Sequence, residues 1–315
     1  MNNRPINVLQ LNVAKSSTRV HCLLNDPFYD RFDILLIQDP WWNPIGHTKS
    51  VTNSDEHIYG TTHSPRWHCL MPPVTRASEG PSVVTYYRKG LRWLNTSLSS
   101  CMPSSLNFLS VDFVIFGSIV NITNIYLHGD RATPGLYHII ETPIDHSIPI
   151  IFAGDFNLHH PLWSLSSSTR APSPGTSDLV EWIETNDLDI INTPDVVTRC
   201  GTGTQQDSII DLTIINPQAH ELGWVSQWES SFEAAIGVDH NGILWTLNTF
   251  ANPHALPPRH CIGTISMPPT ETNGKQLSTL PSLNPLLPMS TPITTTAITV
   301  PSLSFAPCQS QRRSQ

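Results

Sequence analysis

A series of short apolar runs, each closed by polar residues, constrains this chain more than any other feature. Runs such as "FDILLIQDP" (32–40) and "DHSIPIIFAGDFN" (145–157) have the length and apolarity of strands covered on both faces. Further strand-like segments lie at 6–13, 81–90, 106–116, 118–127, 208–216 and 242–248. Gly117-Ser118 between two of these segments predicts a hairpin.

Helical patterns are fewer than the strand-like runs. Val20, Leu23 and Leu24 fall on one face of a helix in "STRVHCLLND". In "SDLVEWIETNDLDIIN", Asp178 followed by Glu181 predicts a capped helix start. An excess of strands, several joined as hairpins, favours two mixed or antiparallel sheets with outer helices over a doubly wound parallel sheet.

The composition changes near residue 251. Residues 251–315 contain 11 Pro and 17 Ser/Thr but only five charged residues. Such a segment buries too little apolar surface to offset its ordering entropy, so we expect a disordered tail, with a folded β extension as the alternative. The expected domain is therefore 3–250.

Charge and composition exclude some classes of protein. Residues 1–250 hold 13 Lys+Arg and 24 Asp+Glu, a balance of −11, which argues against non-specific coating of nucleic acid. No apolar run is long enough to cross a bilayer and no signal peptide is evident, so no membrane partner is expected. The six cysteines are widely spaced, as expected of reduced thiols.

Polar residues that could carry chemistry close or interrupt six of these segments. They come from separate elements, a pattern that suits a metal-assisted hydrolase. They are Asn12, Gln38, Asp39, Asn124, Tyr126, Asp155, Asn157, Ser208, Asp211, Asp239 and His240.

Oxygen ligands without cysteine favour Mg²⁺ or Mn²⁺ over Zn²⁺ as the cofactor. Mg²⁺ needs only one or two carboxylates beside a phosphate oxygen, and Asp39 and Asp239 are the candidates. Asn12 is expected to orient a metal-bound water. Each pattern also has a simpler interpretation, because an isolated Asp-His is usually a turn.

The remaining residues suit proton transfer and phosphate contact. Asp155 is expected to accept a proton from the attacking water, while Asn157 and Tyr126 donate to phosphate oxygens. His240 is the candidate donor to the developing phosphorane, with Asp211 holding it in position.

The ordered set N…QDP…NxY…GDFNxHHxxW…SxxDL…DH resembles the endonuclease/exonuclease/phosphatase superfamily. "IQDPWW", "HHPLW" after GDFN, and "LDIINTPDVVTR" make it most similar to the endonuclease domain of LINE-type (non-LTR) retrotransposons, particularly fungal ones. The resemblance runs from about Ile6 to Leu247. It implies an α/β fold, a four-layered α/β sandwich of two mixed β-sheets flanked by helices.

The resemblance also implies an enzyme, a Mg²⁺-dependent DNA endonuclease. It would nick one strand of double-stranded target DNA and leave a 3′-hydroxyl that primes reverse transcription. Element RNA would then be a partner through a separate reverse transcriptase, and a monomer in the nucleus is expected. Asn124, His160 and Ser208 are expected to support the site, although His160 could equally pack the loop.

Two departures from the family pattern bear on activity. The family's metal-binding glutamate is Asp39 here, and the serine before the final Asp-His is Val238. The shorter side chain loses about 1.5 Å of reach. A catalytically impaired relic and a phosphomonoesterase of the same superfamily are therefore the alternatives.

DNA contacts are expected from loops around the strand ends. The candidates are basic or flexible residues, with "TRCGTGTQQDS" as a hairpin that could enter a groove. They are His47, Lys49, Arg66, Arg131, Arg199 and Thr204.

Overall fold

The structure, a computed structural model, describes residues 4–48, 56–76, 78–91, 94–99, 105–129 and 132–248. These residues belong to one compact unit, Met1–Ala255. The tail expected to be disordered, 251–315, lies outside the described residues. Within the described part, no helix has both the length and the apolarity needed to cross a membrane.

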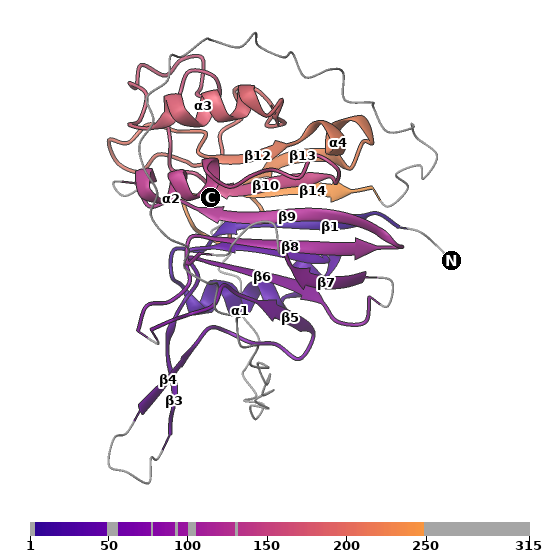
Figure 1. The fold of residues 1–315 in the computed structure, drawn as a ribbon. Helices are drawn as coiled ribbons and strands as arrows, with labels where there is room; N and C mark the ends of the chain where they lie inside the picture. The colour runs from indigo at the N-terminus through magenta and orange to yellow at the C-terminus, as the bar shows by residue number, and fades with distance from the viewer. Residues whose placement is uncertain are drawn as a thin grey trace, which may run out of the picture. The chain divides into compact units, whose positions relative to one another are not determined.

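The first sheet has six strands and contains the N-terminal strand (Figure 1). In spatial order its strands are β13 (Val225–Ser231), β14 (Gly242–Leu247), β1 (Ile6–Asn12), β2 (Ile34–Gln38), β6 (Val83–Arg88) and β5 (Trp67–Leu70). Only β1 and β2 run parallel, and the other neighbours are antiparallel.

The second sheet also has six strands and one parallel pair, β9 with β10. Its order is β11 (Asp189–Ile190), β12 (Asp211–Ile215), β10 (Ile150–Asp155), β9 (Ser118–Tyr126), β8 (Phe108–Ile115) and β7 (Leu94–Leu98). Phe116 and Gly117 connect β8 to β9, which confirms the expected hairpin. A separate hairpin pairs β3 (Asn43–Thr48) with β4 (Glu56–Gly60).

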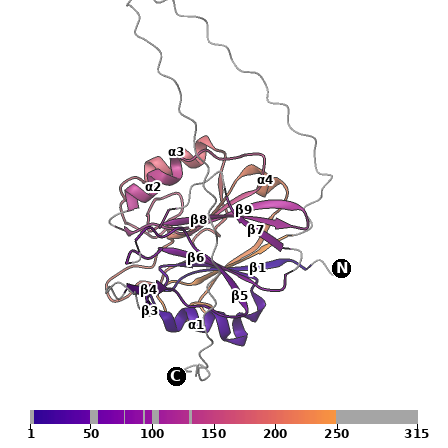
Figure 2. The same cartoon turned by 60° about the horizontal axis from the view of Figure 1, so that its bottom comes forward.

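Helices cover the outer faces of both sheets, which makes four layers (Figure 2). Two of them, α1 (Ser17–Asn25) and the 3₁₀ helix η1 (Pro27–Arg31), pack on the first sheet. Helices α2 (Ala132–Ile140) and α3 (Thr176–Thr185) pack on the second sheet, and α4 (Pro217–Glu221) precedes β13. The expected α/β sandwich is therefore confirmed.

The helix starts are set by local hydrogen bonds and backbone geometry. At α1, the Ser16 hydroxyl accepts a hydrogen bond from the Arg19 backbone N–H, as an N-cap should. The expected cap at Asp178 is wrong: α3 begins after Gly175, whose left-handed φ of 79° makes the turn. Asp178 instead accepts a hydrogen bond from the Tyr137 hydroxyl of α2.

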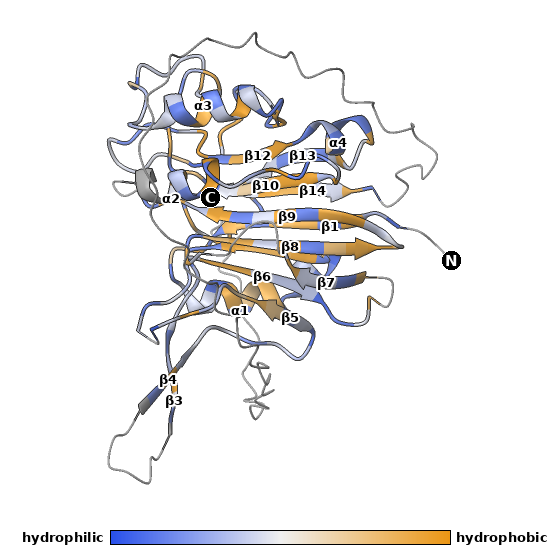
Figure 3. Cartoon of the chain, viewed as in Figure 1, coloured by the Kyte–Doolittle hydropathy of each residue, from blue (hydrophilic) through white to orange (hydrophobic). Residues whose placement is uncertain are grey.

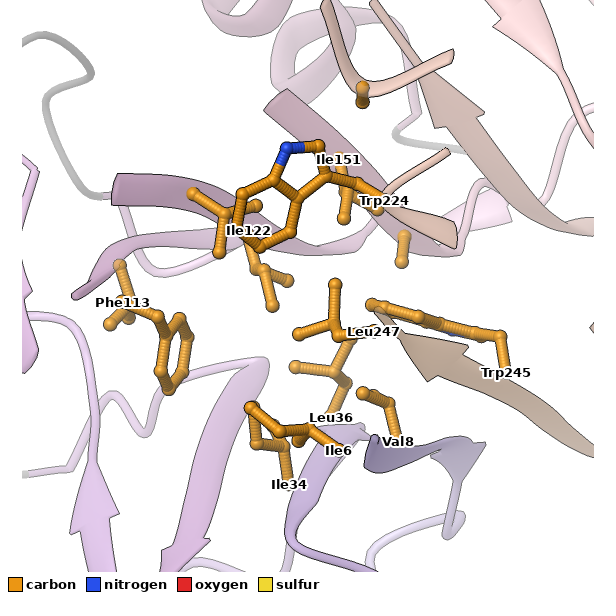
Figure 4. Packing of buried hydrophobic residues seen from close by; sticks show 14 of the residues in the cluster. Ile6, Val8, Ile34, Leu36, Phe113, Ile122, Ile151, Trp224, Trp245 and Leu247 are labelled. Carbon is orange, nitrogen blue, oxygen red and sulfur yellow. The ribbon is translucent and has the colours of Figure 1, made fainter. Parts of the chain in front are cut away.

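The core between the sheets is built by alternate residues of the central strands. Figure 3 shows apolar residues concentrated in these strands. Because side chains on a strand alternate between its faces, Ile6 and Val8 point between the sheets while Leu9 and Leu11 face α1. Figure 4 shows this inter-sheet packing, which includes Trp224.

Toward one end of the sandwich, the same inward rows change from apolar to polar. The row Ile6–Val8 continues to Gln10 and Asn12, and Ile34–Leu36 continues to Gln38. In the second sheet, Val120–Ile122 continues to Asn124 and Tyr126, Ile151–Ala153 to Asp155, and Ile215–Thr213 to Asp211. Neighbouring strands are in register at this end, where Asn12 pairs with Gln38, and Asp155 pairs with both Tyr126 and Asp211.

Asn124 ties the two sheets together inside this polar layer. Its fully buried amide donates to the carbonyls of Ile37 and Val84 at 3.2 Å and accepts from the Gln38 amide at 2.5 Å. Buried amides without partners are costly, so these bonds fix the register of one sheet against the other. Asn124 thus supports the site by joining the sheets that carry it.

We expect Asn124→Ala to lower the free energy of unfolding by about 3 kcal/mol, because it strands buried acceptors and opens a cavity. Chemical denaturation measures the change. Asn95→Ala on the exposed side of β7 is the matched control and should change stability by less than about 0.5 kcal/mol. Equal losses in the two variants would contradict a role for Asn124 as an inter-sheet tie.

Candidate active site

Asp155, the last residue of β10, lies at the centre of the polar layer and is fully buried. Its carboxylate accepts hydrogen bonds from the Asn12 amide at 2.9 Å, the Asn157 backbone N–H at 2.9 Å and the Asn157 amide at 3.1 Å. Burial, together with the nearby Asp211 carboxylate, raises the pKa of Asp155 to about 7, although His240 and these donors oppose the rise. A carboxyl group with this pKa can exchange a proton near neutral pH.

His240 connects Asp155 to a second buried acid. Its Nδ1 lies 2.9 Å from Asp211 Oδ2, and its Nε2 lies 3.7 Å from Asp155 Oδ2. Burial alone would lower the pKa of His240, but the Asp211, Asp155 and Asp239 carboxylates outweigh it and raise that pKa to about 9. The ring is therefore protonated at neutral pH and held in a fixed orientation, with Nε2 toward the site.

Thr198 positions this chain of groups and was missed by the sequence analysis. Its buried hydroxyl accepts hydrogen bonds from the backbone N–H groups of Ile210 and Asp211, at 3.0 and 3.1 Å. A buried threonine next to a loop gives no pattern in a single sequence. By contrast, Asp211 and His240 were found in the sequence because each lies next to a predicted strand. The structure places both side chains beside Asp155.

Asp39 lies at the rim of the site, directly after β2, and its side chain is only 16% exposed. Burial raises the pKa of its carboxyl group, while Lys15, His128 and His240 act in the opposite direction. The Lys15 ammonium is 3.8 Å from Asp39 Oδ1, a long ion pair on a mostly exposed lysine. A partly desolvated carboxylate with this weak neutralisation is suited to receive a further cation.

Asp239, on the other side of the rim, is already paired. Its Oδ2 accepts a hydrogen bond from Arg199 Nε at 2.7 Å. Burial would raise the pKa of Asp239, but Arg199 and His240 outweigh it and lower that pKa. Arg199, expected to contact DNA, therefore has its guanidinium directed at a site carboxylate and also donates to Gln205.

Tyr126 and Asn157 complete the site. Burial and the Asp39 and Asp155 carboxylates raise the pKa of Tyr126, so its hydroxyl stays protonated and can donate. The Asn157 amide donates to the Leu127 carbonyl at 2.7 Å as well as to Asp155, so in this state it positions the acid instead of facing a ligand. His128, missed from the sequence, packs its ring edge against Tyr126 at 4.8 Å.

At this end of the sandwich, the residues that follow three central strands have a strained backbone with positive φ. Ala14 and Lys15 follow β1, Asp39 follows β2 and Asn157 follows β10, all with φ between 48° and 53°. Non-glycine residues rarely adopt this left-handed region, and such residues cluster at functional sites. In the part of the chain that the structure describes, five other non-glycine residues have positive φ, among them Phe116 in the β8–β9 hairpin, so the strained turns agree with a site at this end without identifying it.

Two sets of residues could hold a metal ion. Among described residues, Asp155, Asp211 and His240 offer ligand atoms within 4.8 Å of one another. A protonated His240 cannot ligate a metal, however, and these atoms already bond to one another. Asp39, Asp239 and Asn12 offer oxygen ligands, the type that a hard cation such as Mg²⁺ prefers; Asp239 is paired with Arg199, and the Asn12 amide oxygen accepts from the Ala14 backbone N–H at 2.9 Å.

The residues expected to bind DNA are dispersed. Arg66 forms an ion pair with Asp30. It precedes β5 at the end of the first sheet opposite Gln38, about 20 Å away along the strand direction. Thr204 is exposed in the loop before Ser208, and the His47 ring contacts His57 on the β3–β4 hairpin. Lys49 and Arg131 lie outside the described residues.

His160 agrees with the second of the two interpretations left open for it, and the role of Ser208 stays a prediction. His160 Nδ1 accepts from the Leu162 backbone N–H and its ring packs on Trp163 at 5.2 Å, so it organises the loop. Ser208 is buried, and its hydroxyl has no hydrogen-bond partner among the described residues.

Comparison with known proteins agrees with the resemblance found in the sequence. Residues 120–244, which carry GDFN and the final Asp-His, match the model of the family described as "Endonuclease-reverse transcriptase". No curated protein matches the chain.

Solved structures of related fold also match. The endonuclease domain of TRAS1, a telomere-specific non-LTR retrotransposon, has 17% identity and a TM-score of 0.58, covering 78% of this chain and 99% of its own. AP endonuclease LMAP from Leishmania major has 12% identity and a TM-score of 0.52, covering 79% and 89%. An AP endonuclease from Archaeoglobus fulgidus has 12% identity and a TM-score of 0.50, covering 77% and 99%. At these identities the likeness establishes the fold alone, an α/β sandwich of two mixed sheets flanked by helices.

We expect Asp211→Asn to lower the pKa of His240 from about 9, because the carboxylate that most opposes burial is lost while Asp155 and Asp239 remain. A pH titration of the His240 ring by NMR measures it. Asp187→Asn, exposed and distant, is the control.

Asp211→Asn should also alter how the free energy of unfolding depends on pH. Because the folded pKa of His240 is raised, its contribution is complete below pH ~6.5 and is lost as the pH rises to about 9. Asp211→Asn should make this alkaline loss in the free energy of unfolding smaller and shift it to lower pH. An unchanged His240 pKa would contradict the assigned pairing.

Proposed function

We propose that this protein is a metal-dependent phosphodiesterase that nicks one strand of double-stranded DNA and leaves a 3′-hydroxyl. The observation that most supports this function is the buried array of interacting side chains Asp155, His240 and Asp211. The carboxylates of Asp39 and Asp239 lie at the rim of the same site. One acid near pKa 7 and one cationic histidine within 3.7 Å provide a base and a charge-stabilising donor for phosphate chemistry.

In the proposed reaction, Asp155 takes a proton from water as the water oxygen attacks the scissile phosphorus. The bond from phosphorus to the 3′-oxygen breaks, and that oxygen takes up a proton to become the hydroxyl. His240 Nε2–H and the Tyr126 hydroxyl donate to the phosphate oxygens, whose negative charge increases in the transition state. Asp211 keeps His240 protonated and oriented throughout.

Mg²⁺ or Mn²⁺ would be held by Asp39 and Asp239, with Asn12 alongside, and would neutralise charge on the bound phosphate. The Asp39 carboxylate fits this role because it is partly buried and only weakly paired. The 3′-hydroxyl product suits priming by a reverse transcriptase acting on element RNA. A nuclear location follows from that role, and the protein is expected to act as a monomer.

A second candidate is a catalytically impaired relic of such an enzyme, which one observation favours. Asp39 stands where the family has glutamate, and its shorter side chain holds the carboxylate about 1.5 Å farther back. A displacement of that size can lower a rate about 100-fold. Val238 packs against the apolar cluster beneath α1, where a serine would have supplied a hydroxyl.

We expect the wild-type protein to nick supercoiled plasmid with Mg²⁺, and Asp155→Asn to be at least about 100-fold slower because the general base is lost. Conversion to the open circular form, followed on agarose gels, gives the rate. Asp187→Asn makes the same chemical change at an exposed position and should nick at the wild-type rate. Equal rates for the two variants would exclude Asp155 as the base, and turnover of an inositol phosphate without nicking would favour a phosphomonoesterase.

Asp39→Glu should increase the nicking rate by up to about 100-fold, since it restores the longer reach. Asp39→Asn keeps the length, removes the charge, and should abolish metal-dependent nicking. Nicking by Asp39→Glu but not by the wild type would identify the protein as a relic. A faster Asp39→Asn would exclude Asp39 as a metal ligand.

A further inference from the structure

Arg199 binds one of the two rim carboxylates that the proposed function assigns to the metal ion. Its Nε donates to Asp239 Oδ2 at 2.7 Å, and the two side chains are 28% and 27% exposed. The other rim carboxylate, Asp39, has a longer contact, 3.8 Å, with Lys15. A cation that binds Asp239 is repelled by the guanidinium already there, so Arg199 and the metal compete for one carboxylate.

The backbone of Arg199 is fixed, whereas its side chain has weak restraints. Its backbone N–H donates to the Ser208 carbonyl at 3.0 Å, and the residue pairs with His240 on its other side as an isolated bridge. The guanidinium is held by Asp239 and by Oε1 of the exposed Gln205 at 3.2 Å. Partly exposed ion pairs of this kind contribute little to stability. The side chain can therefore change partners while its Cα stays in place.

This fixed backbone places Arg199 beside the groups that are proposed to contact phosphate. Paired residues of neighbouring strands have Cα atoms about 5 Å apart, and His240 is such a partner. Burial and the Asp39 and Asp155 carboxylates raise the pKa of Tyr126, and Arg199 acts in the opposite direction. The guanidinium is thus within electrostatic reach of the Tyr126 hydroxyl, the second proposed phosphate donor.

Phosphate is the anion that best suits a released guanidinium. Arginine carries five N–H donors in a planar fork and forms strong, often bidentate, hydrogen bonds to phosphate oxygens. The Asp239 carboxylate attracts Arg199 less once it ligates a divalent cation, because the cation neutralises its charge. A DNA phosphodiester held by Tyr126 and His240 then supplies the acceptor oxygens.

We propose that the Arg199 side chain exchanges partners: it pairs with Asp239 in the free protein and moves to a phosphate of the DNA strand when Asp239 ligates the cation. Metal binding and DNA binding would then strengthen each other, as linked equilibria require. The inference rests on the proposed function and deepens it, because Arg199 becomes the residue through which Asp239 controls how firmly the strand is held.

The first test measures Mn²⁺ binding to the protein without DNA, from the EPR signal of the free ion. Arg199→Gln should bind Mn²⁺ at least about fivefold more tightly than the wild type, because the competing charge is gone. Arg66→Gln is the matched control: it breaks an ion pair with Asp30 at the opposite end of the first sheet and should leave Mn²⁺ affinity unchanged. Unchanged or weaker binding by Arg199→Gln would overturn the inference.

The second test measures binding of a fluorescein-labelled DNA duplex by anisotropy, once in EDTA and once with Mn²⁺. Every protein in it also carries Asp155→Asn, so that the duplex stays uncut. With Mn²⁺, Arg199→Gln should lower DNA affinity about tenfold, since a hydrogen bond to a charged oxygen is lost. In EDTA the loss should be much smaller, because Asp239 holds Arg199 there. Equal losses in the two conditions, or no loss with Mn²⁺, would contradict the exchange.

Asp239→Asn provides a third test that needs no metal and does not depend on one variant alone. The neutral amide attracts Arg199 less, so the guanidinium should contact DNA even in EDTA. Adding Arg199→Gln should therefore cost more affinity in the Asp239→Asn background than in the wild-type background, a non-additivity that a double-mutant cycle measures. Additive effects of the two changes would overturn the inference.

Two further results separate this inference from a folding defect and from the proposed function. Arg199→Gln keeps the backbone bonds to Ser208 and His240, so its denaturation midpoint should stay close to that of the wild type. Because the three tests measure binding without cutting, a wild type that fails to nick plasmid would overturn the proposed function and leave the exchange standing. Nicking by a wild type whose Mn²⁺ and DNA affinities do not respond to Arg199→Gln would overturn the exchange alone.

Discussion

The rest of the structure depends on the stabilisation of one buried carboxylate, that of Asp155, inside the sandwich. An isolated buried charge is costly unless it is hydrogen-bonded and paired. Here the Asn12 and Asn157 amides and the cationic ring of His240 surround it, and each comes from a different segment of the chain. Forming this environment requires both sheets, so the site exists only when the two halves of the fold are packed together.

The position of the site follows from strand direction. Each sheet contains one parallel pair, and the carboxyl ends of β1, β2, β9 and β10 all lie at one end of the sandwich. Inward-facing rows that are apolar elsewhere become polar in the last two or three positions. The active site is therefore a continuation of the core, built by the same alternation of side chains.

Much of this could be predicted from the sequence. Buried strands ending in Asp155 or in Gln38 have a period and a length that are visible in one chain, and the order of the polar residues identified the family. The apolar runs of these strands also fix which residues pair across neighbouring strands at the site. The pairing of His240 with Asp211 was predicted from the chemistry of the two residues, since a histidine that donates to phosphate needs an acid to hold it.

Other features depend on contacts that the sequence does not display. The left-handed turn at Gly175 replaced the expected cap at Asp178, because the bond to Tyr137 comes from another helix. Arg66 was a candidate DNA contact because it is a basic residue in a loop. Since β5 is antiparallel to β6, the residue before β5 lies at the far end of the sheet from the site. Asn124 binds carbonyls of the opposite sheet, a role that only the packing of the two sheets creates.

The backbone at Asp39 has a consequence for how such a domain changes over time. This exit turn holds residue 39 at a φ of 48°, where aspartate and asparagine are tolerated better than longer side chains. The metal role proposed for residue 39 favours the longer glutamate, whereas the local backbone conformation favours aspartate. Under that proposal, selection for cutting acts against the conformational preference of the turn. In a lineage where cutting no longer matters, the turn alone would retain a glutamate-to-aspartate change and disfavour its reversal.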